Sequence, residues 1–69
     1  MSELVREAVK DDRRVALLRC YDGEGSTVVE VEADQTGARR FYQFQTAPEA
    51  FRFVQEAVLA LQYLGCTVS

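Results

Sequence analysis

The chain has 69 residues, of which 48% are hydrophobic and 10% aromatic, and its formal net charge is −3. This length fits a single domain, residues 1–69, and the apolar fraction excludes an intrinsically disordered chain because it suffices for a packed core. The excess of acidic residues argues against a protein that binds nucleic acid mainly through its phosphates, since such proteins carry an excess of Lys and Arg.

Neither a signal peptide nor a membrane span is expected. Residues 1–10 are charged and lack an apolar centre, and the longest apolar run, 57–61, is far shorter than the roughly 20 residues that cross a bilayer. Cys20 and Cys66 are too few for a disulfide framework, and we expect both to be reduced. The sequence therefore predicts a cytoplasmic protein that does not bind a membrane.

The first expected element is a short helix at the N-terminus. Ser2 can cap it, and the polar run 10–13 ends it. Apolar residues recur at the i, i+1, i+4, i+5 spacing of a narrow helical stripe. These residues are Leu4, Val5, Ala8 and Val9.

Three strand-like runs follow, at residues 14–21, 27–33 and 39–45. They alternate apolar and polar residues and are rich in β-branched and aromatic side chains. Segments 22–26 and 34–37 separate them and contain the Gly and Asp residues typical of turns. Two short connections in succession predict a three-stranded antiparallel meander.

A long amphipathic helix is predicted from Ala47 to Leu64. Thr46 and Glu49 form a capping box with Pro48 in the first turn, and Gly65 ends the helix. A short strand over 66–68 is expected to run parallel to its neighbour, because one helical crossover precedes it. The predicted fold class is α+β: a short N-terminal helix, the meander, the long helix on one sheet face and the C-terminal strand.

The long helix and the sheet each present one apolar face, and these two faces are expected to pack together. The helical stripe consists of Ala50, Phe53, Val54, Ala57, Val58, Leu61 and Leu64. The facing sheet residues are Ala16, Leu18, Cys20, Val29, Val31, Tyr42 and Phe44.

The second sheet face is more apolar than one solvated face requires. Arg19 on this face can pair with Glu30 or Glu32. We expect either the N-terminal helix or a second copy of the chain to cover the apolar half of the face.

Leu59 and Tyr63 lie one turn apart on the polar side of the long helix and offer another contact surface. The candidate protein-interaction residues are Val15, Leu17, Val28, Phe41, Leu59 and Tyr63.

The first functional hypothesis is therefore a non-enzymatic protein-interaction module that binds itself, as a homodimer, or another protein. The alternative is single-stranded nucleic-acid binding. Aromatic side chains on a sheet can stack on bases, and Arg residues interleaved with them can neutralise phosphates. More commonly, such Arg residues flank a strand and their charge limits aggregation. The nucleic-acid residues are Arg13, Arg14, Arg39, Arg40 and Tyr42.

We expect no enzyme. The chain has no His, the commonest general base and zinc ligand. Cys20 and Cys66 lack metal-site spacing, and paired carboxylates such as Glu30 with Glu32 are more often solvated strand charges than an acid/base pair. The sequence predicts no catalytic residue, no cofactor and no metal.

Overall fold

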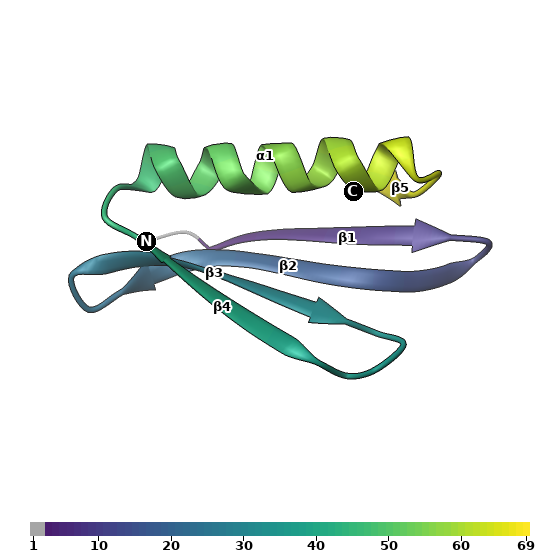
Figure 1. Cartoon of the computed structure of the whole chain (residues 1–69), viewed down its shortest axis with the longest axis horizontal. Coiled ribbons are helices and arrows are strands. Elements are labelled where there is room, and N and C mark those ends of the chain that lie inside the picture. Colours follow the sequence, from purple (N-terminus) through teal and green to yellow (C-terminus); the bar gives the residue numbers. More distant parts are fainter. Residues whose placement is uncertain (1–2) are drawn as a thin grey trace.

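The computed structural model describes residues 3–69 and has an α+β fold, in which one helix packs on one face of a five-stranded antiparallel sheet (Figure 1). The sheet order is β4-β3-β2-β1-β5, so β4 and β5 form its two edges. The elements are β1 (Leu4–Lys10), β2 (Arg13–Gly23), β3 (Ser26–Ala33), β4 (Arg39–Phe44), α1 (Ala47–Tyr63) and β5 (Thr67–Val68).

The predicted N-terminal helix is wrong, because these residues form β1, which pairs antiparallel with β2. Asp11 and Asp12 have φ angles of 53° and 63°, and Lys10 pairs with Arg13 across them. Two central residues at positive φ make the tight hairpin turn whose twist matches that of the flanking strands. The polar run therefore turns the chain back instead of ending a helix. Ser2, the predicted cap, lies outside the described residues.

The predicted meander is confirmed as the β2-β3-β4 part of a larger sheet, with five strands instead of three. β2 is longer than expected and is bulged where it pairs with β1. Ala8 pairs with Ala16 and Val9 with Arg14, so Val15 is the extra residue on β2. A bulge of this kind locally bends the strand and increases its twist.

The C-terminal strand forms, but it runs antiparallel to its neighbour instead of parallel. Thr67 and Val68 of β5 pair with β1, and the backbone N–H and carbonyl groups of Ser69 and Glu7 exchange two hydrogen bonds of 3.0 Å. The crossover helix does join two strands that run the same way, β4 and β5, but these lie at opposite edges of the sheet. The strand beside β5 is β1, which runs the other way.

Both predicted ends of the long helix are confirmed to within one residue. The Thr46 hydroxyl accepts a hydrogen bond from the Glu49 N–H (3.4 Å) and donates one to the Glu49 carboxylate (2.9 Å). At the other end Gly65 has φ 97°, and the N–H groups of Gly65 and Cys66 donate to the Gln62 and Leu61 carbonyl oxygens. These two bonds form a Schellman cap.

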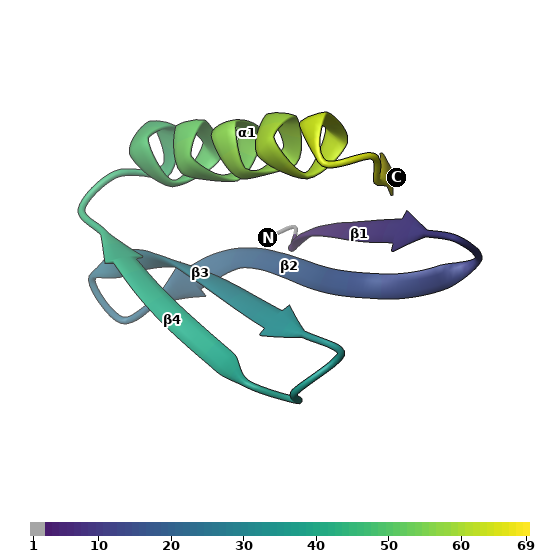
Figure 2. The same cartoon turned by 45° about the vertical axis from the view of Figure 1, so that its right-hand side comes forward.

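The core lies between α1 and the facing side of the sheet, as predicted, but Leu64 of the predicted stripe is the C-cap of the helix and is exposed. Leu18 and Val29 are its largest fully buried side chains. Phe53 of α1 packs on Tyr42 and Phe44 of β4, with ring centroids 4.8 and 5.4 Å apart. The sheet twists, so that β4 approaches the helix at its last residues and lies away from it at its first (Figure 2). The buried core residues are Ala8, Ala16, Leu18, Cys20, Val29, Ala50, Val54, Val58 and Cys66.

Candidate functional site

Within residues 3–69, no helix packs on the sheet face opposite α1 (Figure 1). The strand register arranges its side chains in rows that cross the sheet. One row runs from Val5 through Arg19 and Glu30 to Phe41. The next contains Glu7, Leu17, Glu32 and Arg39. Both rows mix apolar, acidic and basic side chains.

Two of the predicted interaction residues on this face, Leu17 and Val28, are already buried within the single chain, each with 8% of its surface exposed. Val28 packs so closely on Gly23 that a Cβ atom there would lie 3.0 Å from the Val28 methyl group. Leu17 is flanked across the sheet by Glu7 and Glu32. These two residues therefore need no second molecule to cover them, and the predicted N-terminal helix does not do so either.

Four apolar side chains of the sheet stay exposed: Leu4 and Val5 of β1, Val15 of β2 and Phe41 of β4. Phe41, in the edge strand β4, is 58% exposed, and Val5, at the β1 end of the same row, is 47% exposed. Val15 is also exposed, at the bulge. Val5 is absent from the predicted set because its spacing with Leu4, Ala8 and Val9 predicts a helix. Its pairing with β2 is the observation that places it on this face.

The outer face of α1 carries further exposed apolar side chains. Leu59 and Tyr63 are exposed where the sequence placed them, with 91% of Tyr63 accessible. Phe51 is exposed as well, although the prediction did not name it. Its position outside the buried stripe of the helix is the signal that would have identified it. Arg52 and Glu56 form an i,i+4 ion pair (3.5 Å) on this outer face.

Two of the four candidate nucleic-acid arginines are engaged by carboxylates. The Arg14 Nε atom donates to both carboxylate oxygens of Asp34, at 3.0 and 2.8 Å, and this hydrogen bonding raises the Arg14 pKa. The Arg39 Nε atom lies 3.8 Å from carboxylate oxygens of both Glu30 and Glu32. Arg39 thus takes the ion pairs that the sequence suggested for Arg19.

The remaining two, Arg13 and Arg40, are exposed and form no ion pair with any residue from 3 to 69. They do not lie together. Arg40 pairs with Val31, which in turn pairs with Leu18 of β2. Arg13 lies five residues before Leu18, at the start of β2. At about 3.3 Å per residue this separates them by about 15 Å or more. Tyr42 lies on the helix side of the sheet against Phe53, away from the open face.

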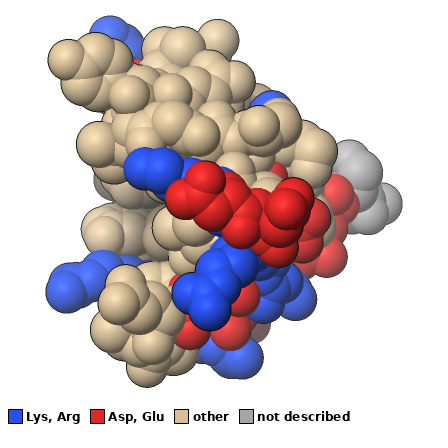
Figure 3. Space-filling view, turned by 90° about the vertical axis from the view of Figure 1, so that its right-hand side faces the viewer, with Lys and Arg blue, Asp and Glu red and all other residues tan. Residues whose placement is uncertain are grey.

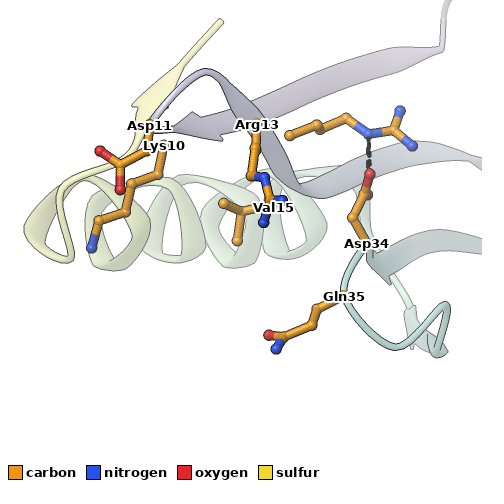
Figure 4. A pocket seen from close by; sticks show the side chains of 7 residues that line it. Lys10, Asp11, Arg13, Val15, Asp34 and Gln35 are labelled. Atoms are coloured by element: carbon orange, nitrogen blue, oxygen red, sulfur yellow. Dashed lines mark hydrogen bonds and ion pairs between the residues drawn. The ribbon is translucent and has the colours of Figure 1, made fainter.

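The end of the molecule that carries the β1–β2 and β3–β4 turns mixes acidic and basic side chains (Figure 3). A shallow, open depression lies here (Figure 4). Two of its three basic side chains already have partners, because Lys10 bonds to the Leu64 carbonyl oxygen and Arg14 to Asp34. Its lining residues are Lys10, Asp11, Arg13, Arg14, Val15, Asp34 and Gln35.

The thiols lie in the core, and they are not joined in a disulfide. Cys20 and Cys66 have only 3% and 8% of their surfaces exposed, and both belong to the same core cluster. Burial, helped by the negative charge of Asp22, raises the pKa of the Cys20 thiol. A buried, protonated thiol is a poor nucleophile. In the described part of the chain, no three His, Cys, Asp or Glu side chains are grouped so that they could hold a metal ion.

No helix within residues 3–69 is long and apolar enough to cross a membrane. No family model, curated protein or solved structure matches the chain. Its surface chemistry is therefore the guide to its function. That surface combines exposed aromatic and aliphatic side chains with charges of both signs, among which Arg14, Arg39 and Arg52 form ion pairs with carboxylates of the same chain.

Proposed function

We propose that the chain is a non-enzymatic protein-interaction module that assembles with a second copy of itself. The observation that carries this proposal is the exposure of Phe41, a large aromatic side chain in an edge strand with more than half of its surface in water. Removing apolar surface from water contributes about 25 cal/mol per Å². Aromatic side chains are enriched in protein interfaces for this reason.

A second copy is supported by the size of the core. In a chain of 69 residues, Leu18 and Val29 are the only large side chains whose burial is complete among those described. Small domains bury a modest fraction of their surface and commonly gain stability by association. A dimer contact that covers Phe41 would extend the apolar burial beyond what α1 provides.

The charge distribution also supports self-association. Arg39 lies beside Glu30 and Glu32, so the surface around Phe41 carries both signs. Two copies that meet there do not bring two like-charged surfaces together, which would cost several kcal/mol.

Single-stranded nucleic acid is the alternative partner, through Arg13, Arg40 and Tyr42 together with the two paired arginines. The arrangement supports it less, because Arg14 and Arg39 would have to leave their carboxylates to bind phosphate. This alternative expects oligonucleotide binding that weakens steeply as salt rises. Tight binding of a single-stranded oligonucleotide by a monomer would replace the interaction module with this function.

Sedimentation equilibrium from low to high micromolar concentration tests the proposal. We expect the average mass to rise from that of one chain towards that of two. Phe41→Ser should shift this rise to higher concentration. Gln35→Ser is the matched control, because Gln35 is an exposed polar residue of the turn between β3 and β4, outside the β4 strand. A chain that stays monomeric at high micromolar concentration contradicts the proposal.

A further inference from the structure

We infer that the proposed self-association, on which this inference rests, occurs by antiparallel pairing of β4 with β4 of a second copy. The two edges of the sheet are unequal. β5 contributes two residues to one edge, whereas β4 presents six residues, Arg39–Phe44, at the other. In the part of the chain that the structure describes, no strand lies beyond β4, so half of its backbone N–H and carbonyl groups point away from the sheet.

β4 lacks most of the features that prevent edge strands from pairing. It contains no Pro and no Lys, and its ladder with β3 continues without a bulge from Arg39 to Phe44. Arg39 and Arg40, both at its start, are its only charged residues. Antiparallel pairing places the start of one strand beside the end of the other, so the Arg residues of the two copies do not meet.

A two-fold axis beside Phe41 gives the most favourable register. Opposed residues in an antiparallel pair project to the same face, so Phe41 lies opposite Phe41 of the second copy on the open face. The same register places Arg40 opposite Tyr42 of the second copy on the helix side. An Arg over a Tyr ring is a favourable cation–π arrangement.

The third pair in this register is Arg39 opposite Gln43 of the second copy, again on the open face. The pairing joins the two sheets into one and keeps both α1 helices on the same side. Val5 and Leu59 remain exposed in this arrangement. Val5 lies in β1, near the opposite edge of the sheet, and Leu59 lies on the outer face of α1. They can therefore report on other modes of contact.

Disulfide trapping with a mixture of two variants, each carrying one added cysteine, tests this register. Arg39→Cys mixed with Gln43→Cys places two thiols on directly opposed residues, with Cα atoms about 5 Å apart, which a disulfide can span. Either variant alone places the two copies of its new thiol four residues out of register, about 13 Å apart along the strands. The unmodified chain, whose two thiols are buried, is the blank. Val5→Cys and Leu59→Cys report on contacts through the open face and through the outer face of α1.

A covalent dimer that forms in the mixture and in neither variant alone supports the β4 contact. A chain that dimerises reversibly but crosslinks at Val5→Cys or Leu59→Cys, or fails to crosslink in the mixture, overturns it and leaves self-association intact. Equal crosslinking of Arg39→Cys alone and of the mixture also overturns it, because that result indicates random collision. A strict monomer at high micromolar concentration removes both the contact and the proposed function.

Discussion

The ammonium group of Lys10 donates a hydrogen bond of 2.9 Å to the backbone carbonyl oxygen of Leu64. Lys10 is the last residue of β1, and Leu64 is the C-cap of α1. The carbonyl groups at the C-terminus of a helix form the negative end of its dipole, and a cation there is stabilising. The last turn of α1 contains no basic residue of its own. A side chain from the first hairpin therefore supplies the charge that the helix sequence lacks.

Lys10→Met should lower the free energy of unfolding by about 0.5–1 kcal/mol, because it removes both the charge and the hydrogen bond at the end of the helix. Urea unfolding followed by circular dichroism measures this loss, which should shrink at high salt. Arg13→Met is the matched control, since Arg13 is an exposed cation beside the same turn without an ion pair to the described residues. An equal loss in both variants would contradict the role given to Lys10.

Replacing Asp11-Asp12 by Asn-Gly should raise the free energy of unfolding by about 0.5–1 kcal/mol. Both positions have positive φ, which Asn and Gly adopt at lower cost than Asp. Chemical denaturation of the two chains measures the difference. Asp11→Ala with Asp12→Ala is the opposing control and should be destabilising, because Ala resists positive φ. A stabilising Ala pair would instead favour a helix that ends here.

Stability should fall as the pH rises above the ordinary pKa of a thiol, about 8.5, through Cys20. Its pKa is raised in the folded chain, so above that pH the unfolded chain has released the proton while the folded chain still holds it. The contribution is complete below the unfolded pKa and is lost as the pH approaches the folded one.

Urea unfolding from neutral pH to about pH 10 measures this slope, and Cys20→Ala, which cannot titrate, should flatten it relative to the parent chain. The comparison concerns slopes, because the small cavity left by Ala lowers stability at every pH. Equal slopes in the two proteins would show that the Cys20 thiol is not perturbed by folding.

Much of this fold is encoded locally. The β2-β3-β4 meander follows from alternating residues and short turns, and α1 follows from its cap at Thr46, its stop at Gly65 and its apolar stripe. These signals act over a few residues, because a cap, a turn and a periodic face are made by neighbours in the chain. The side of the sheet that faces α1 could be read from the same alternation, and its residues form the core.

The surface was less predictable than the core. Exposure of Leu59 and Tyr63 followed from helical spacing. Burial of Leu17 and Val28 did not follow from strand alternation, because it depends on the neighbours that the register brings beside them. The pairing of Arg14 with Asp34 likewise joins the β1–β2 and β3–β4 ends, which no local pattern connects.

The sequence by itself determined one helix and a meander, since those elements are specified by residues close together in the chain. Only the tertiary structure decided that residues 4–10 form a strand, because their apolar spacing suits a helix and a strand alike and the free edge of β2 selects between them. It also decided the direction of β5, which is set by the strand beside it and not by the helix that precedes it. Strand pairing is a contact between distant residues, so its partner and direction exist only once the chain has folded.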